Sequence, residues 1–164
     1  MSKIYKTGFY GGKFFPFHQG HFYCLAKMAS ECEDAVLIMF VNGKDETSYS
    51  GEKHDFLSVE ERIKKINKIV KNFPNVRFTT LYCDVIYEGE EVEADNWKKE
   101  APYVRAVVGS KFDAVYSSEK GYDAFFKEVY PFAHHRIVDV DRKEFPISAT
   151  QIRENPELYK KWEI

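Results

Sequence analysis

An uninterrupted apolar segment constrains the fold of this chain more than any other feature. Residues 35–41 read Ala-Val-Leu-Ile-Met-Phe-Val, with no polar residue among them. A strand with one face in water alternates apolar and polar residues, whereas a run of this kind is typical of a parallel strand covered on both faces. The segment therefore predicts an α/β fold with helices on both sides of a parallel sheet.

Other segments extend this pattern into alternating strands and helices. Further strands are predicted at Ile4–Tyr10, Val76–Tyr82, Ala114–Tyr116 and His135–Val140. Helices are predicted after His21, from the capping box Ser58–Glu61 to Val70, and over Trp97–Val108, Gly121–Val129 and Ser148–Glu154. The polar segments Asn42–Phe56 and Glu88–Glu93 are expected to be loops. This order predicts a Rossmann-like, doubly wound α/β fold with a five-stranded parallel sheet, and a single domain over residues 1–164.

Composition narrows the environment and the partners of the chain. Its 24 basic and 26 acidic residues give a formal net charge of -2, so no overall positive charge attracts nucleic acid. Cys24, Cys32 and Cys83 form no CxxC pair, and the N-terminus has no apolar signal segment. These features favour a cytoplasmic protein with no membrane contact. Whether the chain forms homo-oligomers stays open.

The turn after the first predicted strand carries the strongest functional signal. Residues 12–21 read Gly-Lys-Phe-Phe-Pro-Phe-His-Gln-Gly-His and lead into the first predicted helix. Gly20 lets a ligand approach the backbone closely, and the unpaired N–H groups at the start of a helix attract anions. His18 and His21 add side-chain donors at the same point. The turn therefore predicts a site for nucleotide phosphates.

Two common phosphate-binding motifs do not match this turn. A Walker A loop ending at residues 12–13 would place Thr7 and Phe14 where the motif requires Gly and Ser or Thr. The dinucleotide motif fails as well, because the glycines at positions 8, 11 and 12 have the wrong spacing. The histidine-containing part of the turn is the remaining candidate.

Two motifs together indicate a superfamily. Residues 18–21, His-Gln-Gly-His, resemble the HxGH motif of the nucleotidyltransferase superfamily, and Gly12 and Phe14 match the glycine and aromatic residue that usually precede it. A second segment, Ile147–Arg153, resembles the ISxTxxR motif in the expected order and distance. Taken singly, the histidines fit an unliganded helix start, and Ser148 fits a simple N-cap. Their joint occurrence identifies the chain as a member of this superfamily.

Three longer segments narrow the resemblance. Residues 116–122, 138–142 and 145–156 resemble the adenylyltransferase domain of bacterial bifunctional NMN adenylyltransferase/ribosylnicotinamide kinases, and the similarity covers almost the whole chain. This resemblance implies transfer of AMP from ATP to nicotinamide mononucleotide (NMN), which gives NAD and pyrophosphate. The family continues into a kinase domain with its own P-loop, whereas this chain stops at Ile164 and has no Walker motif. We therefore expect no kinase activity.

The resemblance also implies roles for individual residues. His18, His21 and Arg153 are implied as catalytic residues that hold the phosphates, with His21 closest to the transferring centre. ATP contacts are implied for Gly12, Lys13, Phe14, Gly20, Ser118, Ser148 and Thr150. Acceptor contacts are expected from Trp97, as a stacking platform for the cationic nicotinamide ring, and from Arg62. Mg²⁺ is expected to arrive on the ATP phosphates, with no protein residue as a dedicated metal ligand.

Alternatives stay open for several of these residues and for the function. Trp97 fits a core position nearly as well, Lys13 fits a solvated surface, and Arg62 fits a surface ion pair with Glu. The adjacent His134 and His135 should point to opposite faces of a strand, which argues against a metal site. Phosphopantetheine adenylyltransferases and cytidylyltransferases are alternatives on the same fold. A sensor that binds ATP or NAD without turnover is an alternative of another class.

Overall fold

The structure is a computed structural model that describes residues 3–49, 51–87 and 93–164. Its strands are β1 (Tyr5–Gly12), β2 (Cys32–Val41), β3 (Val76–Tyr82), β4 (Ala114–Ser117) and β5 (His134–Ile137). Its α-helices are α1 (Gln19–Glu31), α2 (Gly43–Ser48), α3 (Val59–Val70), α4 (Cys83–Tyr87), α5 (Glu93–Val108), α6 (Asp123–Val129), α7 (Ala149–Glu154) and α8 (Tyr159–Trp162). Short 3-10 helices cover η1 (Glu52–Leu57), η2 (Lys120–Tyr122) and η3 (Pro156–Leu158).

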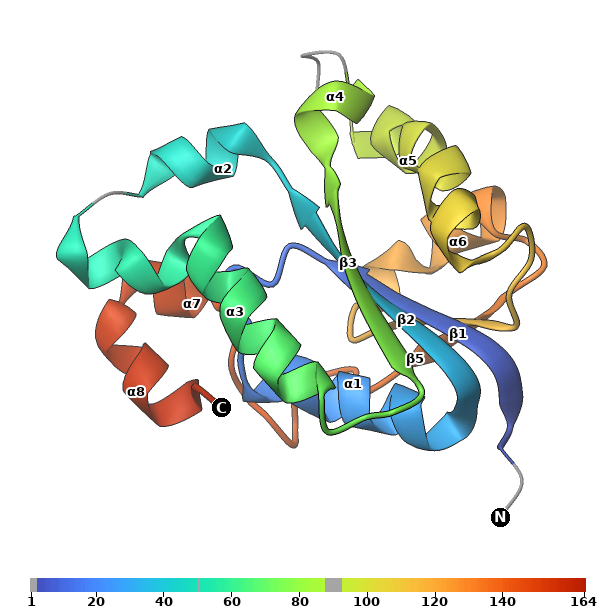
Figure 1. The fold of residues 1–164 in the computed structure, drawn as a ribbon, viewed down its shortest axis with the longest axis horizontal. Coiled ribbons are helices and arrows are strands. Elements are labelled where there is room, and N and C mark those ends of the chain that lie inside the picture. The colour runs from blue at the N-terminus through green and yellow to red at the C-terminus, as the bar shows by residue number, and fades with distance from the viewer. Residues whose placement is uncertain (1–2, 50, 88–92) are drawn as a thin grey trace.

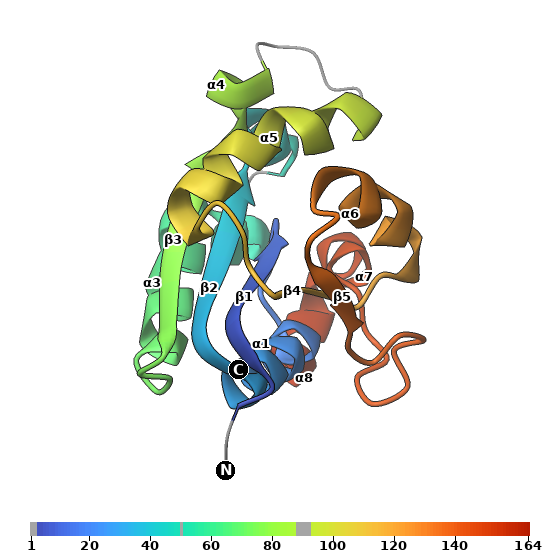
Figure 2. The same ribbon diagram turned by 90° about the vertical axis from the view of Figure 1, so that its right-hand side faces the viewer.

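The strands form one parallel sheet with β1 at its centre. The strand order is β3-β2-β1-β4-β5 (Figures 1 and 2). Phe9 of β1 pairs with Val36 of β2 on one side and with Val115 of β4 on the other. The chain thus leaves the centre first toward β2 and later toward β4, and ligands of doubly wound sheets bind beyond the carboxyl ends of the strands at such a reversal. The predicted fold class is confirmed.

Helices cover both faces of the sheet, and this explains the unbroken apolar run in β2. Leu37 and Met39 belong to the core cluster that β2 shares with α1 and α3. Val36 and Ile38 face the opposite side, where α5 and α6 pack (Figure 1). Because successive strand residues point to opposite faces, a strand buried on both sides needs an apolar residue at every position.

The expected loop at Asn42–Phe56 is wrong, because α2 and η1 lie within it. Asn42 caps α2: its side chain accepts a hydrogen bond from the Lys44 N–H at 2.9 Å. The Ser48 hydroxyl then donates to the Lys44 carbonyl at 2.7 Å. Polar side chains can thus stabilise a short helix without any apolar periodicity, and periodicity was the signal that the sequence analysis used.

Several element boundaries also differ from the expected ones. Helix α1 begins at Gln19 with His18 as its N-cap, ahead of the expected start. Strand β5 ends at Ile137, short of Val140, because Asp139 has a positive φ of 54°, which takes the backbone out of the extended conformation. The short helices α4 and α8 were not expected. Of the expected acidic loop, residues 88–92 lie outside the described part of the chain.

No helix in the described ranges has the length and apolar character needed to cross a membrane.

Candidate active site

A cavity of about 520 Å³ opens at the carboxyl ends of the central strands. The turn between β1 and α1, helix α5, the segment after β4, and the segment from Asp139 to Arg153 all contribute to its lining, as do residues of β1, α6 and the end of β2. Its volume lies in the range of cavities that hold nucleotide-sized ligands. The predicted phosphate-binding turn therefore opens into a space large enough for a substrate.

The turn between β1 and α1 folds back on itself through Phe14. This residue has a positive φ of 48° and is only 2% exposed, and its ring packs edge-on against Phe17 and His21. A Cβ atom at Gly12 would come within 2.9 Å of the Phe14 ring, so only glycine leaves room for this packing. Both Gly12 and Phe14 line the cavity. The ring contacts of Phe14 with Tyr10, Phe17 and His21 place it in the aromatic cluster that supports the histidines.

Backbone hydrogen bonds fix the tautomers of His18 and His21. His18 Nδ1 accepts from the Gly20 N–H at 3.0 Å, and His21 Nδ1 accepts from the His18 N–H at 3.2 Å. An imidazole nitrogen that accepts carries no hydrogen, so in the neutral ring the hydrogen lies on Nε2. The two rings stack with their centroids 3.8 Å apart. The two capping hydrogen bonds at the start of α1 thus leave the Nε2–H of each histidine available to donate to a ligand.

The pKa values of both histidines favour the neutral form. Burial lowers the pKa of His18 to about 4, and the positive charge of Arg142 acts in the same direction. Burial also lowers the pKa of His21, as do His18 and Arg142. His18 is 1% exposed, and its Nε2 has no hydrogen-bond partner among the described residues. A buried donor without a partner costs free energy, and a phosphate oxygen of a bound nucleotide would satisfy it.

Gly20 lets the His18 ring occupy its place over the start of α1. A Cβ atom at position 20 would lie 2.8 Å from His18 Cε1 and 3.1 Å from Nδ1. Since the ring is already held by its hydrogen bond to the Gly20 N–H, a larger residue would displace it. The predicted contribution of Gly20 to the site is therefore also steric.

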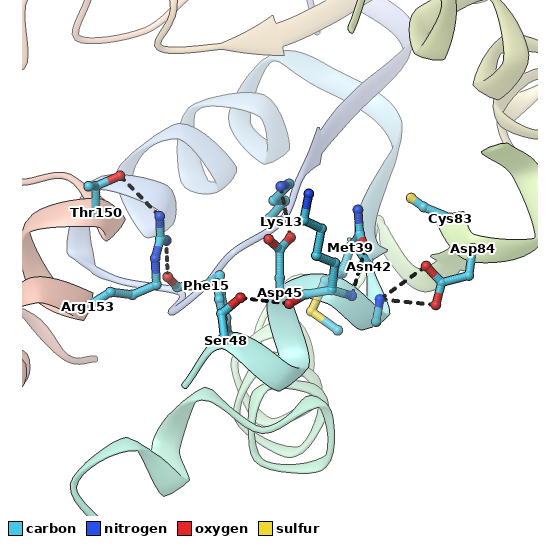
Figure 3. Close-up of polar contacts among 12 residues, drawn as sticks. Lys13, Phe15, Met39, Asn42, Asp45, Ser48, Cys83, Asp84, Thr150 and Arg153 are labelled. Atoms are coloured by element: carbon cyan, nitrogen blue, oxygen red, sulfur yellow. Dashed lines mark hydrogen bonds and ion pairs between the residues drawn. The ribbon is translucent and has the colours of Figure 1, made fainter. Parts of the chain in front are cut away.

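Arg153 reaches the cavity from α7 and contacts the turn. Its Nη1 donates to the Phe15 carbonyl at 2.6 Å, and its Nη2 donates to Thr150 Oγ1 at 3.1 Å (Figure 3). Ser148 caps α7 by accepting from the Gln151 N–H at 3.2 Å. Arg153 and Ala149 line the cavity, whereas Ser148 and Thr150 are not among its lining residues. Of the second motif, Arg153 therefore reaches the cavity wall, whereas the hydroxyls of Ser148 and Thr150 make hydrogen bonds within α7.

Lys13 lies at the edge of the same cavity and has an acidic partner. Its Nζ is 2.8 Å from Asp45 Oδ2 on α2 (Figure 3). The Lys13 side chain is 58% exposed, so this ion pair is weak and the lysine can turn to a phosphate. Helix α2, which the sequence analysis missed, therefore holds one of the predicted ATP contacts.

Arg62, a predicted acceptor contact, is not among the residues that line the cavity. It is 3% exposed, its Nη1 donates to the Lys13 carbonyl at 3.0 Å, and its Nε donates to the Leu57 carbonyl at 2.8 Å. The guanidinium also lies over the Phe15 ring at 4.6 Å. These contacts connect α3 to the turn behind the histidines, and the burial of Arg62 shows that it does not lie on the surface. Its contact with the acceptor stays a prediction without support from this geometry.

Trp97 lies at the other end of the cavity, in a cluster of aromatic rings. It stacks on Phe125 with centroids 5.3 Å apart and an interplanar angle of 16°, and it meets Phe126 edge-on at 5.1 Å. It also lines the cavity. The two predicted roles of Trp97, as a core residue and as a platform for a ligand ring, are therefore compatible.

The sequence analysis missed polar residues beside Trp97. Asn96 and Glu100 also line the cavity; Glu100 is 8% exposed, and Asn96 Oδ1 is buried without a partner among the described residues. Their spacing of four residues places them on the same side of α5. That spacing, next to a tryptophan, was the available signal.

Arg142 is a further cavity residue that the sequence analysis did not select. Its Nη1 donates to the Ile147 carbonyl at 2.8 Å, and its Nη2 pairs with the Glu119 carboxylate. Arg142 therefore ties the segment after β4 to the start of the second motif. Ser118 and Glu119 line the cavity too, as the prediction for Ser118 requires. The described residues contain no group of three or more His, Cys, Asp or Glu side chains that could hold a metal ion.

Comparison with known proteins identifies the family of this chain. The Cytidylyltransferase-like family model matches residues 9–155. The trifunctional NAD biosynthesis/regulator protein NadR of Salmonella typhimurium is 28% identical over 160 residues, which is 93% of this chain and 37% of the relative. Phosphopantetheine adenylyltransferase of Clostridium botulinum is 30% identical over 86 residues, 51% of this chain and 48% of the relative.

Solved structures show the same fold. A crystal structure of NadR protein in complex with NAD and AMP-PNP has a TM-score of 0.68 at 23% identity, over 98% of this chain and 46% of that one. A bifunctional NMN adenylyltransferase/ADP ribose pyrophosphatase from Francisella tularensis has a TM-score of 0.65 at 17% identity, over 98% of this chain and 44% of that one. The chain spans less than half the length of these proteins. With its family match across both motifs, the chain belongs to the cytidylyltransferase-like family and forms a nucleotidyltransferase domain.

Proposed function

We propose that this domain transfers AMP from ATP to nicotinamide mononucleotide and so forms NAD and pyrophosphate. One observation carries the proposal: a single cavity is lined both by a group of phosphate donors, from the turn after β1 and from α7, and by Trp97 of α5. The similarity of nearly the whole chain to NadR, a trifunctional NAD biosynthesis/regulator protein, supports a reaction that forms NAD.

The donors at the phosphate end fit the charge changes of such a reaction. An oxygen of the NMN phosphate attacks the α-phosphorus of ATP, and the bond from that phosphorus to the α–β bridging oxygen breaks as pyrophosphate leaves. The attacking phosphate is already ionised, so no general base is needed. The Nε2–H groups of His18 and His21 and the guanidinium of Arg153 would bind the oxygens on which negative charge increases.

Neutral histidines suit this role. A neutral imidazole donates one hydrogen bond without the desolvation cost of a buried charge, and it takes no proton from the reacting groups. The positive charge at the site would come instead from Arg153, Arg142 and Lys13, which all line the cavity.

Mg²⁺ is part of the proposal as a companion of ATP. The cavity is lined by the donors His18, His21 and Arg153, which fit phosphate oxygens, and no group of three or more His, Cys, Asp or Glu side chains lies together among the described residues. The ion would therefore be held by phosphate oxygens and water, and would reduce the charge repulsion between ATP and the acceptor phosphate.

Phosphopantetheine adenylyltransferase activity is the alternative that a specific observation favours, because relatives with that activity match about half of the chain. The deciding experiment offers Mg²⁺ and either ATP or CTP with a panel of acceptors: NMN, nicotinate mononucleotide and 4′-phosphopantetheine. Pyrophosphate release and the coupled product are measured for each pair. We expect release with ATP and NMN, and a rate lower by about 10²–10³ in His21→Asn, which keeps an acceptor for the His18 N–H but loses the Nε2 donor.

The outcomes separate the candidates. Turnover with another acceptor and none with NMN would show that the acceptor assignment is wrong. Binding of ATP or NAD by calorimetry, with no pyrophosphate release from any acceptor, would establish a sensor. Unchanged turnover in His21→Asn would remove His21 from the catalytic group.

A further inference from the structure

Strand β5 carries two adjacent histidines whose surroundings differ. His134 lies at the exposed side of the strand, where its Nδ1 contacts the hydroxyl of Tyr5. The His135 side chain is 5% exposed and lies between β4 and α6, with the Phe126 ring edge-on at 4.7 Å. The two histidines therefore point in opposite directions, and only His135 is connected to the cavity wall.

His135 connects the two ends of one cavity-lining segment. Its Nε2 lies 2.6 Å from Oγ of Ser117, the last residue of β4. Its Nδ1 lies 3.1 Å from Oδ1 of Asp123, the first residue of α6. Residues 117–123 are the segment between these contacts, and its members Ser117, Ser118, Glu119 and Tyr122 line the cavity. One side chain thus holds both ends of this wall.

The hydrogens along these contacts have a consistent direction. The Asp123 carboxylate can only accept, so His135 Nδ1 carries the hydrogen and Nε2 accepts from the Ser117 hydroxyl. Ser117 Oγ in turn accepts from the Glu119 N–H at 3.2 Å. The Ser117 hydroxyl also lies 3.3 Å from the Glu119 carbonyl, but its 2.6 Å contact with His135 Nε2 is much the shorter of the two. The hydrogen bonds therefore run in one direction from the Glu119 N–H to the Asp123 carboxylate, and chains of this kind are stronger than their separate bonds.

The charge state of His135 agrees with this arrangement. Burial lowers the pKa of His135, and Asp123 opposes that effect. The charged or titratable groups that act on the ring are Asp123 and Lys127 on α6 and His134 on its own strand. Because the net pKa shift is downward, the ring is neutral at pH 7, which leaves Nε2 free to accept from Ser117.

We propose that Ser117, His135 and Asp123 form a positioning chain that fixes the wall of residues 117–123 in the shape that binds ATP. His135 is then a positioning residue, because it acts through Ser117 and does not line the cavity itself. The proposal takes from the proposed function only that ATP occupies the cavity. A nucleophilic role for Ser117, as in a hydrolase triad, does not fit, since Ser117 is 4% exposed and Oγ already accepts from the Glu119 N–H.

Direct ATP binding tests the positioning chain without any acceptor. Calorimetry with Mg²⁺ and ATP would compare the wild type with His135→Gln, Ser117→Ala and the double variant. Each single change should raise the Kd for ATP about tenfold, the effect of one lost buried hydrogen bond. The double variant should bind no more weakly than the weaker single variant, because both changes interrupt the same chain. In His135→Gln the kcat of NAD formation should stay within about twofold, since His135 does not line the cavity and the phosphate donors are untouched.

Two matched controls keep stability and positioning apart. His134→Gln makes the same change at the adjacent residue, and Lys127→Gln removes the other partner of Asp123, whose Oδ2 lies 2.8 Å from Lys127 Nζ. Both should bind ATP like the wild type. Asp123→Asn keeps an amide oxygen but removes the carboxylate charge that both His135 and Lys127 contact. It should weaken ATP binding as His135→Gln does, whereas Lys127→Gln should not. Thermal unfolding is measured for every variant.

Three results would overturn the positioning chain. They are an unchanged Kd in His135→Gln with a lowered Tm, additive effects in the double variant, and an equal loss of affinity in His134→Gln. ATP binding by the wild type without NAD formation would count against the proposed function alone. Absence of ATP binding by the wild type would contradict both proposals.

Discussion

At the residue scale, the start of α1 shows how a backbone hydrogen bond decides the chemistry of a side chain. The Gly20 N–H points at His18 Nδ1 because His18 is the N-cap of the helix. That bond removes one acceptor from the ring and leaves Nε2 as a donor in the buried space. The ring therefore offers phosphate a hydrogen bond, and it does so without carrying a charge.

The depressed pKa of His18 predicts a loss of stability in acid. In the unfolded chain the imidazole has its ordinary pKa near ~6.5, whereas burial holds it at about 4 in the folded chain. The unfolded state therefore binds the proton first as the pH falls. This contribution is fully present above about pH 6.5, is lost between about 6.5 and 4, and amounts to roughly 3 kcal/mol. His21 shifts in the same direction and adds to it.

The measurement is urea unfolding of the wild type and of His18→Asn at several pH values between about 7 and 4. Asparagine is a good N-cap and keeps an acceptor for the Gly20 N–H, but it does not titrate. The wild type should lose more free energy of unfolding than the variant over this range. Parallel pH profiles would show that His18 is not held neutral by the fold.

At the element scale, Ser148 has two possible roles: it caps α7, and the resemblance also implies that it contacts ATP. The hydroxyl accepts from the Gln151 N–H, and the Gln151 side chain accepts from the Ser148 N–H at 2.8 Å. Ser148→Ala should lower the free energy of unfolding by about 1 kcal/mol through loss of the cap. Ser148→Asp keeps the cap and should leave stability near that of the wild type, but its charge would repel a phosphate nearby.

ATP affinity and thermal unfolding of both variants decide the matter. If Ser148 contacts the phosphates, the Asp variant should raise the Kd for ATP more than tenfold while it stays folded as well as the wild type. If the Asp variant binds ATP normally, then Ser148 only shapes α7, and Arg153 alone represents the second motif at the phosphates.

Elements with a strong pattern could be predicted from the sequence, and short polar ones could not. Ser58 caps α3 as its sequence indicates, and the side chain accepts from the Glu61 N–H at 3.1 Å. The apolar run in β2 follows directly from burial on both faces. Helix α2 depends on two local side-chain bonds, from Asn42 and Ser48, and those bonds leave no periodic signal. The left-handed backbone of Asp139, which ends β5, also has no such signal.

At the scale of the whole molecule, the cavity depends on strand order. The turn after β1 and the segment after β4 are far apart in the chain and meet because β4 pairs with β1. The motifs indicated candidate phosphate-binding residues, but the position of Arg142 depends on its ion pair with Glu119, which lies 23 residues earlier in the chain. Arg62 shows the converse: the sequence around it pointed to a substrate contact, whereas in the fold its side chain is buried and contacts the turn after β1.

The two ends of the cavity should therefore respond differently to substitution, and Trp97 tests this. One face of its ring stacks on Phe125, so the ring is held in place where it meets the cavity. Trp97→Leu removes the aromatic face and should raise KM for NMN about tenfold, since a cation near an indole gains a binding free energy of this order. The KM for ATP should change less than about twofold, because the phosphate donors lie at the other end. Trp97→Phe keeps an aromatic face, so its KM for NMN should lie between that of the wild type and that of Trp97→Leu. Steady-state kinetics with each substrate varied in turn gives both constants, and equal rises in the two KM values would mean that Trp97 serves packing alone.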